Sequence, residues 1–570
     1  MEKWVLAAKR ADFQEIGRKY GIDPVIARII RNRDITEDAE INQYLNGTLD
    51  DIPSWKSLKD IDKAVEIISQ KIDLGTRMRI IGDYDIDGVT ATYILLKGFK
   101  RLGANVDTYI PDRIADGYGI HNHLIEKAKE DGVDTIVTCD NGISAADQIA
   151  FAKKMGMTVV VTDHHEVPFE DTEEGRKYKL PLADAIINPK QSDCTYPNKN
   201  ICGAVVAMKL VFALYEKYGI PESEKEDYLE PAAIATVGDI MDLQGENRIL
   251  VKEGLLRLPH TKNKGLKALI RAIGLENQKI SSYDIGFRLG PCINASGRLD
   301  TAKRALELLN ASNRREAVTL AADLKELNDS RKEMTEEGVE EAVRQIESSS
   351  WKDDQVLVVY LPECHESIAG IIAGRIKERY YRPTFVLTKG ETGVKGSGRS
   401  IEAYDMFAEM SRCRELFTKF GGHKLAAGLS LEEENVEVFR KRINELADLT
   451  EEDLQMKVSI DMRLPFPYIN EELIHELKIL EPFGKGNGKP LFAESKLRVI
   501  QPRIFGKNRN VLKCRLEDQQ GNQMEAVYFG EVEDCLQKME KKQIMSFTYY
   551  PSINEYMGRR TIQLTIVNYQ

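Results

Sequence analysis

Three aspartates occupy alternate positions in the stretch RIIGDYDIDGVTAT, at Asp83, Asp85 and Asp87. Alternate side chains of an extended segment point the same way, so these carboxylates repel one another unless a cation lies among them. A divalent metal ion is the simplest explanation, beside two open alternatives: a solvated acidic turn, and a helix N-terminus, whose partial positive charge stabilises carboxylates. A calcium loop of the D-x-D-x-D-G kind does not fit, because Ile94 stands where its bidentate glutamate belongs.

Further acidic and imidazole side chains follow other apolar runs of the chain. They are Asp140 after DTIVT, then Asp163, His164 and His165 after TVVVT, and Asp239 and Asp242 at the end of AAIATVGDIMDL. Open parallel sheets bind ligands at the carboxyl ends of their strands. Because several clusters stand at such ends, we expect them to form one site rather than separate solvated loops.

The donor types indicate which metal this site would take. Carboxylates suit Mg²⁺ or Mn²⁺, and imidazole shifts the preference toward Mn²⁺. The eight cysteines stand singly with no C-x-x-C pair, which argues against structural zinc. With this many donors, two ions about 4 Å apart are plausible, the spacing used in phosphoryl displacement. The pattern predicts phosphoester or phosphoanhydride hydrolysis, with one of His164 and His165 as a ligand and the other at the scissile phosphate or in proton transfer.

The surrounding elements read as alternating strands and helices, the pattern of an α/β domain with a parallel sheet. The strands are expected at 77–81, 106–110, 134–138, 158–162 and 184–188. Almost no Gly or Pro occurs from about 302 to 348, which predicts long helices. The expected parts are a helical segment at 1–70, a catalytic α/β domain at 71–305, connecting helices at 306–350, a second α/β domain at 351–450 and a small β-barrel domain at 455–570.

Bulk composition agrees with several globular domains. The chain has 570 residues and a formal net charge of -11, which argues against a generally nucleic-acid-binding surface but allows a local basic groove. No apolar run reaches the roughly eighteen residues of a membrane span. The sequence MEKWVLAAKR lacks the apolar segment of a secretory signal. A cytoplasmic location and no membrane partner are therefore expected.

A basic segment lies in the predicted barrel. Between Lys485 and Arg515 there are nine basic residues and one acidic residue, Glu494. Basic side chains that follow phosphates, with aromatic rings that stack on bases, are what a single-strand groove uses. Phe492 and Phe505 are interleaved with these charges, and either stack on bases or belong to the barrel core.

Four motifs in order, GDYDIDGVTAT, PDRIADGYG, TCDNGIS and TDHHE, resemble those of the DHH phosphoesterases. The likeness continues through RLGPCINASGRLD at 288–300. HESIAGIIAGRI, GSGRS and FGGHKLAAG are similar to the accessory DHHA1 domain, and LEPFGKGNGKPLF at 480–492 resembles the start of an OB-type domain. The resemblance covers nearly the whole chain and points to the longer, single-strand-specific exonucleases of this family. It implies two α/β lobes, DHH and DHHA1, joined by long helices, with a C-terminal OB-type β-barrel.

The resemblance also implies site residues and a reaction. Two metal ions, Mn²⁺ by preference with Mg²⁺ as the second candidate, would be bound by Asp83, Asp85, Asp87, Asp140, His164 and Asp239. His165 would lie beside the scissile phosphate, so that His165, Asp87 and His164 carry the catalysis. The implied reaction is hydrolysis of single-stranded DNA from its 5′ end to 5′-mononucleotides, in DNA repair and recombination.

Single-stranded DNA is the implied partner, with single-strand-binding protein as a further candidate. The residues expected to contact DNA are Arg288, Asn294, Ser296, Arg298, His365, Arg399, Ser400, Gly421, Gly422, His423, Lys507 and Arg509. Arg298 fits equally well as a structural ion-pair partner. Cys364 stands where the family pattern leads us to expect Trp.

Two other functions fit the same residues. A DHH-family hydrolase of short oligonucleotides, cyclic dinucleotides or polyphosphate would need only the two α/β domains, and the basic barrel argues against it. A non-catalytic scaffold that binds single strands would have lost metal ligands, whereas this chain has all of them.

Overall fold

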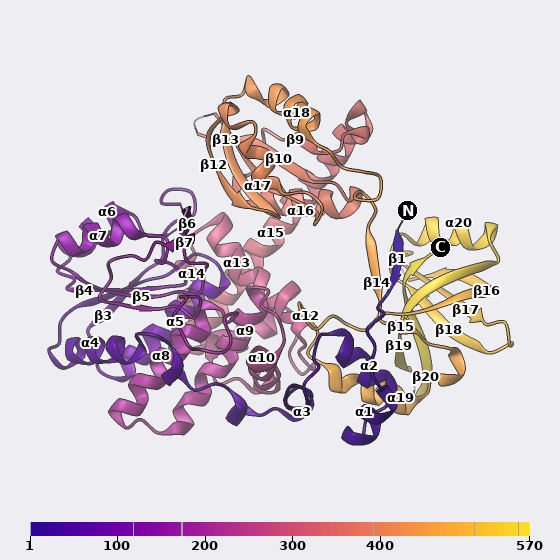
Figure 1. Ribbon diagram of the computed structural model, residues 1–570, viewed down its shortest axis with the longest axis horizontal. Coiled ribbons are helices and arrows are strands. Elements are labelled where there is room, and N and C mark those ends of the chain that lie inside the picture. Colours follow the sequence, from indigo (N-terminus) through magenta and orange to yellow (C-terminus); the bar gives the residue numbers. More distant parts are fainter. Residues whose placement is uncertain (1, 118, 173–174, 392, 507, 557) are drawn as a thin grey trace. The chain divides into compact units, whose positions relative to one another are not determined.

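The computed structural model describes residues 2–117, 119–172, 175–391, 393–506, 508–556 and 558–570 (Figure 1). The chain forms two compact units, each made of separate segments. The first unit contains the residues up to Ile52, Asp242–Ile249 and Lys457–Gln570, and the second contains Pro53–Met241 and Leu250–Met456. Among the described residues, no helix is long and apolar enough to cross a membrane.

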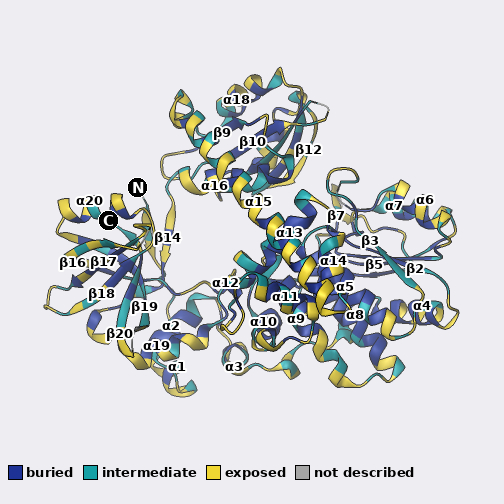
Figure 2. Cartoon of the chain, turned by 180° about the vertical axis from the view of Figure 1, so that it is seen from behind, coloured by how far each residue is buried: buried dark blue, intermediate teal, exposed yellow. Residues whose placement is uncertain are grey.

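The second unit begins with the predicted parallel sheet. Its strands, in spatial order, are β3 (Val106–Tyr109), β2 (Met78–Ile81), β4 (Thr135–Cys139), β5 (Thr158–Thr162) and β8 (Ala185–Ile187). Every neighbouring pair is parallel, and the strands lie at the positions expected from sequence. The central strands are buried (Figure 2), as continuous β-branched runs require when helices cover both faces of a sheet.

Helices pack on both faces of this sheet. They are α4 (Ile61–Asp73), α5 (Ile86–Arg101), α6 (Asn122–Glu130), α7 (Ala146–Lys154) and α8 (Gly203–Tyr218). Figure 1 shows α6 and α7 on one face and α4, α5 and α8 on the other. A hairpin of β6 (Phe169–Thr172) and β7 (Gly175–Tyr178) follows β5.

A helical layer continues this lobe and leads to the next. It comprises α9 (Leu229–Gly238), α10 (Gly245–Arg257), α11 (Lys264–Ala272), α12 (Ser282–Asp284), the π-helical turn η5 (Ile285–Leu289), α13 (Gly290–Leu299), α14 (Lys303–Leu309) and α15 (Arg314–Glu347). The 34-residue helix α15 confirms the long connecting helix that the scarcity of Gly and Pro predicts.

The second lobe of this unit has a mixed sheet in the order β12-β13-β11-β10-β9. Its elements are β9 (Leu357–Tyr360), α16 (Ala369–Tyr380), β10 (Thr384–Lys389), β11 (Val394–Arg399), α17 (Met406–Ser411), β12 (Phe417–His423), β13 (Ala426–Leu431) and α18 (Asn435–Leu446). Only β9 and β10 are parallel; the other pairs are antiparallel. The two α/β lobes of the prediction are therefore confirmed.

The first unit is a β-barrel with the N-terminal helices packed on it. Its elements are β1 (Lys3–Leu6), α1 (Phe13–Tyr20), α2 (Pro24–Asn32), α3 (Asp38–Asn46), β14 (Lys457–Ile460), β15 (Met462–Arg463), α19 (Glu471–Leu477), β16 (Phe492–Phe505), β17 (Val511–Glu517), β18 (Gln523–Tyr528), α20 (Val532–Lys541), β19 (Ile544–Tyr556) and β20 (Arg559–Tyr569). Pairing of β16 with both β17 and β19 closes the barrel. Strand β1, which the sequence analysis did not predict, pairs in parallel with β14. The fold class is confirmed, and the bounds of the five predicted parts stay predictions.

Candidate metal centre and nucleic-acid interface

The acidic and imidazole side chains meet at the carboxyl ends of β2, β4 and β5, together with the end of α9. Three overlapping groups have ligand atoms within 4.8 Å of one another: Asp83, Asp85 and Asp140; Asp140, His164 and His165; Asp87, His164 and Asp239. The six residues assigned to metal by resemblance all belong to these groups. Asp242 is in none of these groups. It belongs to the first unit, where its carboxylate lies 3.7 Å from Lys485 Nζ.

Two helix N-termini stabilise part of the crowded negative charge. Asp85 is the N-cap of α5, and its Oδ1 accepts hydrogen bonds of 3.0 Å from the amides of Asp87 and Gly88. Asp87 accepts bonds of 2.6 and 2.8 Å from the amides of Gly203 and Ala204, at the start of α8. The helix N-terminus proposed from sequence as an alternative to metal therefore exists, but it accounts for only two of the carboxylates.

The remaining ligand atoms are buried without hydrogen-bond partners in the described part of the chain. They include Asp83 Oδ1, Asp140 Oδ1, His164 Nε2 and Asp239 Oδ2. His164 Nε2 lies 3.0 Å from Asp140 Oδ1 and 3.6 Å from Asp239 Oδ2, without the alignment of a hydrogen bond. Native proteins rarely leave buried polar atoms unpaired. These oxygen and nitrogen donors fit a divalent cation such as Mn²⁺ or Mg²⁺.

The pKa values of the candidate ligands also favour a bound divalent cation. Burial, reinforced by neighbouring carboxylates, raises the pKa of Asp83 and of Asp239 to about 8, and raises those of Asp85 and Asp140 as well. Burial lowers the pKa of His164, which favours the neutral ring that binds metals. A divalent cation would bring the carboxylate pKa values down again, because it stabilises the charged form.

His165 is oriented by Asp163, a residue for which the sequence predicted no separate role. Its Nδ1 lies 2.8 Å from Asp163 Oδ1, which also accepts the backbone amides of both histidines. The other carboxylate oxygen accepts the amide of Ile143 at 2.9 Å. Burial acts to lower the pKa of His165, but the bond to Asp163 and the surrounding carboxylates raise it to about 9. Asp163 therefore fixes the orientation of the His165 ring.

Gly203 is a second residue that the sequence analysis missed. A Cβ on Gly203 would lie 2.8 Å from both Cβ and Oδ1 of Asp140, too close for the aspartate to keep its place. The only signal in the sequence is a glycine at the first position of an apolar helix, and this by itself does not indicate a metal site.

We expect Gly203→Ala to weaken Mn²⁺ binding about tenfold, because displaced ligands typically cost ten- to a hundredfold in metal affinity. The Mn²⁺ concentration that gives half-maximal hydrolysis measures this. Gly374→Ala is the matched control, since a Cβ there meets nothing within 4 Å. An unchanged Mn²⁺ requirement in Gly203→Ala would show that Asp140 is not a ligand.

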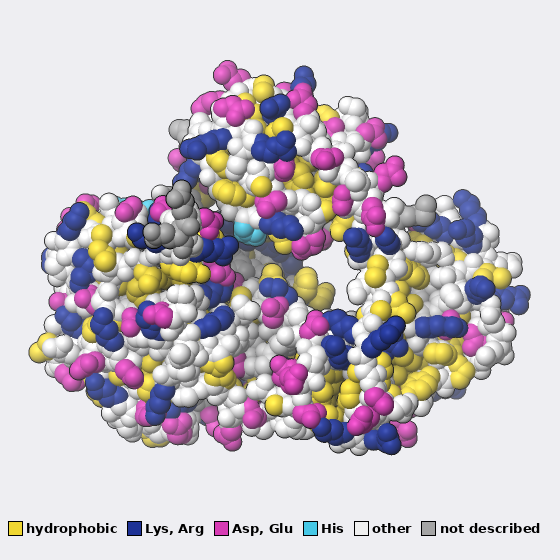
Figure 3. All heavy atoms as spheres, in the orientation of Figure 1, with side chains coloured by type: hydrophobic (Ala, Val, Ile, Leu, Met, Phe, Trp, Pro, Cys, Tyr) yellow, Lys and Arg dark blue, Asp and Glu magenta, His cyan; other side chains and the backbone are white. Residues whose placement is uncertain are grey.

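Two arginines of the second unit, Arg113 and Arg298, interact electrostatically with the carboxylates, and a third, Arg399, interacts with both of them. Burial, together with the positive charges of Arg113 and Arg399 among others, lowers the pKa of the Arg298 guanidinium to about 10. Burial and Arg113 also lower the pKa of Arg399. Arg113 lies over the ring of Tyr84, 4.8 Å from its centroid. Figure 3 shows acidic and basic side chains interspersed over the face of the molecule that it draws. We call Arg113, Arg298 and Arg399 the arginine cluster. Guanidinium groups suit anions such as phosphates, and Arg113 lines a cavity together with Ser367, the residue to which Arg298 donates.

Arg298 and Arg399 were predicted from sequence, whereas Arg113 was missed although its motif PDRIADGYG had been recognised. Arg298 also donates to the carbonyl of Ser367 at 2.7 Å, which ties the first α/β lobe to the second. A cavity of about 430 Å³ lies beside it, lined by both lobes and including Gly421.

The other predicted DNA contacts in this unit have local partners. Asn294 Oδ1 accepts the amide of Ile86 at 2.7 Å. Ser296 and Ser400 are buried, and their hydroxyls donate to backbone carbonyls within their own segments. Arg288 donates to the carbonyl of Ile273 at 2.7 Å. Asn294 therefore positions the aspartate loop.

His365 and the glycine-rich turn complete this set. His365 Nδ1 lies 2.7 Å from the Ser367 hydroxyl, at the start of the turn before α16. Gly421, Gly422 and His423 lie exposed on β12. Their roles toward DNA stay predictions.

The sequence left open whether Phe492 and Phe505 stack on bases or belong to the barrel core, and the structure separates the two rings. Phe492 is fully buried in the barrel core, so the stacking role is wrong for this ring. Phe505 is 47% exposed, and Lys513 Nζ lies 5.6 Å from its centroid. Arg509 pairs with Glu533 at 2.9 Å. Lys507 lies outside the described residues.

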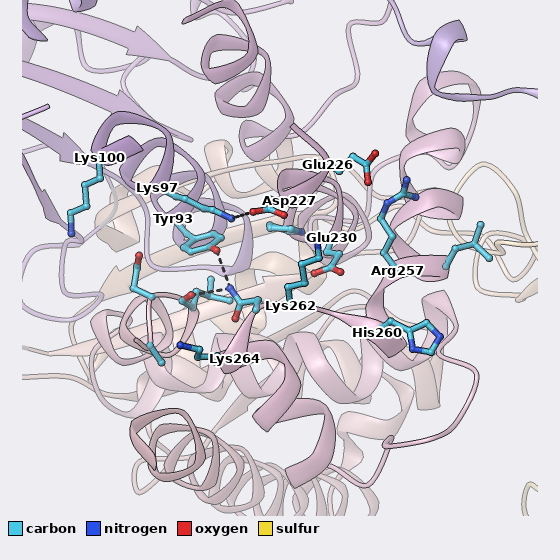
Figure 4. Close-up of a pocket in the computed structure, with 16 residues that line it drawn as sticks. Tyr93, Lys97, Lys100, Glu226, Asp227, Glu230, Arg257, His260, Lys262 and Lys264 are labelled. Atoms are coloured by element: carbon cyan, nitrogen blue, oxygen red, sulfur yellow. Dashed lines mark hydrogen bonds and ion pairs between the residues drawn. The ribbon is translucent and has the colours of Figure 1, made fainter. Parts of the chain in front are cut away.

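A cavity of about 640 Å³ lies elsewhere in the second unit, as Figure 4 shows. Lys97 pairs there with Asp227 at 2.8 Å, and Asn263 donates to the hydroxyl of Tyr93. None of the predicted site residues lines this cavity.

Comparison with known proteins identifies the same parts of the chain. Three domain families match: the DHH family, N-terminal domain, over residues 77–236, the DHHA1 domain over 353–448 and the RecJ OB domain over 460–568. The single-stranded-DNA-specific exonuclease RecJ of Escherichia coli is 35% identical over 570 residues, which cover 96% of each chain. That of Bacillus subtilis is 35% identical over 96% of this chain and 68% of its own length.

The crystal structure of RecJ in complex with Mn²⁺ from Thermus thermophilus superposes with a TM-score of 0.83 at 28% identity. The superposition covers 100% of this chain and 79% of that protein. The family matches extend over all three domain types, and the DHH match contains every member of the carboxylate cluster except Asp239. The chain therefore belongs to the RecJ family of single-stranded-DNA-specific exonucleases.

Proposed function

We propose that this protein is a metal-dependent exonuclease that degrades single-stranded DNA from its 5′ end to 5′-mononucleotides, in DNA repair and recombination. The observation that carries the proposal is the set of buried, unpaired ligand atoms beside the arginine cluster. Its relatives bear the name single-stranded-DNA-specific exonuclease. Single-strand-binding protein is proposed as a partner on the family resemblance.

The proposed cofactor is a pair of Mn²⁺ ions, with Mg²⁺ as the alternative. The ligands would be Asp83, Asp85, Asp87, Asp140, His164 and Asp239. Related RecJ structures hold Mn²⁺ and, in another crystal, Mg²⁺. Such ions supply Lewis acidity at the phosphate and favour deprotonation of water.

The protein's own side chains hold and orient the substrate. Asp163 fixes the ring of His165 through Nδ1, and we propose that this histidine lies beside the scissile phosphate and forms a hydrogen bond with one of its oxygens. The arginine cluster binds strand phosphates, since guanidinium groups match phosphate oxygens in geometry and charge. Gly203 and Ala204 keep the carboxylate of Asp87 in place through their amides.

The test compares single-stranded oligonucleotides blocked at the 5′ or the 3′ end, with Mn²⁺ present. We expect a 5′ block alone to stop release of mononucleotides, and EDTA to stop all hydrolysis. Blunt duplex DNA should be degraded much more slowly. Inhibition by the 3′ block, or hydrolysis of dinucleotides without that of longer strands, would contradict the proposed polarity or substrate.

A further inference from the structure

Two aromatic rings outside the metal centre, Tyr283 and Phe287, lie together on the surface of the second unit. Their centroids are 4.6 Å apart and their planes differ by 23°, so the rings are stacked. They are 64% and 65% exposed. We call them the aromatic pair. Because aromatic side chains gain so much from burial, two large rings held in water together indicate a surface reserved for a ligand.

The exposure is not that of a loose segment. Tyr283 and Phe287 are one helical turn apart on α12 and η5, and Ile285 and Leu289 of the same turn are fully buried. Ser281 caps the start of this helix through a capping box with Asp284. One face of the helix is therefore fixed in the core and the other is presented to solvent. Single π-helical turns of this kind occur frequently at functional sites.

The same helix holds the metal-binding loop. A Cβ on Gly290 would lie 3.1 Å from the side chain of Ile86, and one on Gly238 would lie 2.6 Å from it, so Ile86 is enclosed by α13 and the end of α9. Asn294 also accepts the amide of Ile86. Since Ile86 stands between two candidate ligands, Asp85 and Asp87, the aromatic pair has a fixed position relative to the metal centre.

A third exposed apolar side chain adjoins a candidate ligand. Ile240 follows Asp239 directly and is 65% exposed. Its φ of 56° lies in the left-handed region, which strongly disfavours β-branched residues. Such strain clusters at functional sites. Helix α9, which ends one residue before Asp239, packs against η5, the turn that carries Phe287. Gly286, beside Phe287, lies next to Val237, since a Cβ on Gly286 would be 3.8 Å from the Val237 side chain. The turn that carries Phe287 therefore packs near the end of α9, which leads to Asp239 and Ile240.

We propose that the aromatic pair and Ile240 contact the bases of a single strand whose phosphate lies at the metal centre. This rests on the proposed function and adds the base-contacting surface to it. Ile240 follows the candidate ligand Asp239 directly, and the two stacked rings offer planar apolar surface rather than charge, which suits bases and not phosphates. Bases of a single strand have accessible π faces, whereas those of a duplex are already stacked. Stacking is also tolerant of sequence, as an exonuclease requires.

The test measures strand binding by Tyr283→Ala and Phe287→Ala in a chain that also carries Asp140→Asn to prevent hydrolysis. The ligands are an oligothymidylate and the same strand with a single abasic position moved stepwise from the 5′ end. We expect each substitution to weaken oligothymidylate binding about tenfold. In the chain with both rings intact, an abasic site at one position of the strand should weaken binding. In the ring variants, an abasic site at that position should have no further effect on binding. Tyr283→Phe keeps the ring and should bind normally.

A second variant separates weaker strand binding from a loss of folded protein. Ile240→Asn places a residue that tolerates the left-handed region at this position, so we expect a higher melting temperature together with weaker strand binding. Leu256→Ala is the control, an exposed apolar residue at 63% on α10.

Three results separate the inference from its alternatives. In the first, the ring variants bind oligothymidylate as tightly as the parent chain and respond to the abasic position in the same way. If the wild type nevertheless degrades single strands, this result overturns the inference and leaves the proposed function intact. A fall in melting temperature with unchanged binding would assign the pair to a protein contact and overturn it too. Ring-dependent binding in a wild type without exonuclease activity would sustain the inference and reject the proposed function.

Discussion

Asp140→Asn is expected to abolish exonuclease activity and at the same time to make the metal-free protein more stable. Asp140 is buried among carboxylates, and its Oδ1 has no hydrogen-bond partner among the described residues. Replacing it removes a charge that only a cation compensates. Metal ions supply several kcal/mol of transition-state stabilisation, so activity should fall about a thousandfold. In EDTA the melting temperature should rise by several degrees, because neutralising a buried repulsive charge removes its cost.

Asparagine is the appropriate replacement because Asp140 has a φ of 60°. Asn adopts the left-handed region readily, whereas Ala would add backbone strain to the effect of the lost charge. Addition of Mn²⁺ should raise the melting temperature of the wild type and leave that of the variant nearly unchanged.

Asp60→Asn is the matched control. Asp60 also has a φ of 60°, and its carboxylate accepts the amide of Ile186, far in sequence from the cluster. Its activity and its response to Mn²⁺ should be those of the wild type. An active Asp140→Asn enzyme with an undiminished Mn²⁺ response would remove Asp140 from the metal centre.

Arg298→Met is expected to raise the KM for single-stranded DNA ten- to a hundredfold, with a smaller effect on kcat. A charged hydrogen bond contributes about 1.5 to 3 kcal/mol, which corresponds to that range of affinity. The slope of log affinity against log salt concentration should decrease by about 0.7, the value for one phosphate contact on a single strand. The melting temperature should not fall, because burial lowers the pKa of this guanidinium and Met removes an uncompensated charge.

The same variant decides whether Arg298 is structural. Arg298 donates to the Ser367 carbonyl between the two lobes, so a purely structural role predicts a lower melting temperature and an unchanged salt slope. Arg271→Met is the control, since Arg271 is exposed and pairs with Glu276 at 3.4 Å.

The parallel sheet and the carboxylate cluster could be predicted because both depend on local patterns. Each strand is a β-branched run, and Asp83, Asp140 and His164 follow such runs within two residues. In a parallel sheet those ends lie at the same edge, whatever the conformation of the connecting loops. The positions of these side chains in the sequence were therefore enough to predict that they lie close together in the structure.

What was missed depends on packing between distant segments. Gly203 matters only because α8 begins against Asp140, and Asp163 matters only because its carboxylate turns toward His165. The burial of Phe492 follows from barrel closure, which alternation of residue types does not specify for a 14-residue strand. Arg113 lies in the recognised motif PDRIADGYG, but the motif alone does not show which of its side chains meets the other arginines.

The pairing of β1 with β14 has a consequence for biosynthesis. Lys3 pairs with Lys457, and the apolar faces of α2 and α3 share a core with barrel strands. At about 5 to 20 residues per second, a ribosome needs roughly 20 to 90 s between making these partners. The N-terminal helices must wait, with apolar surface uncovered, while the sheet that carries the aspartates can already form. The order of synthesis therefore differs from the order of assembly, and chaperone dependence should concentrate on the N-terminal helices.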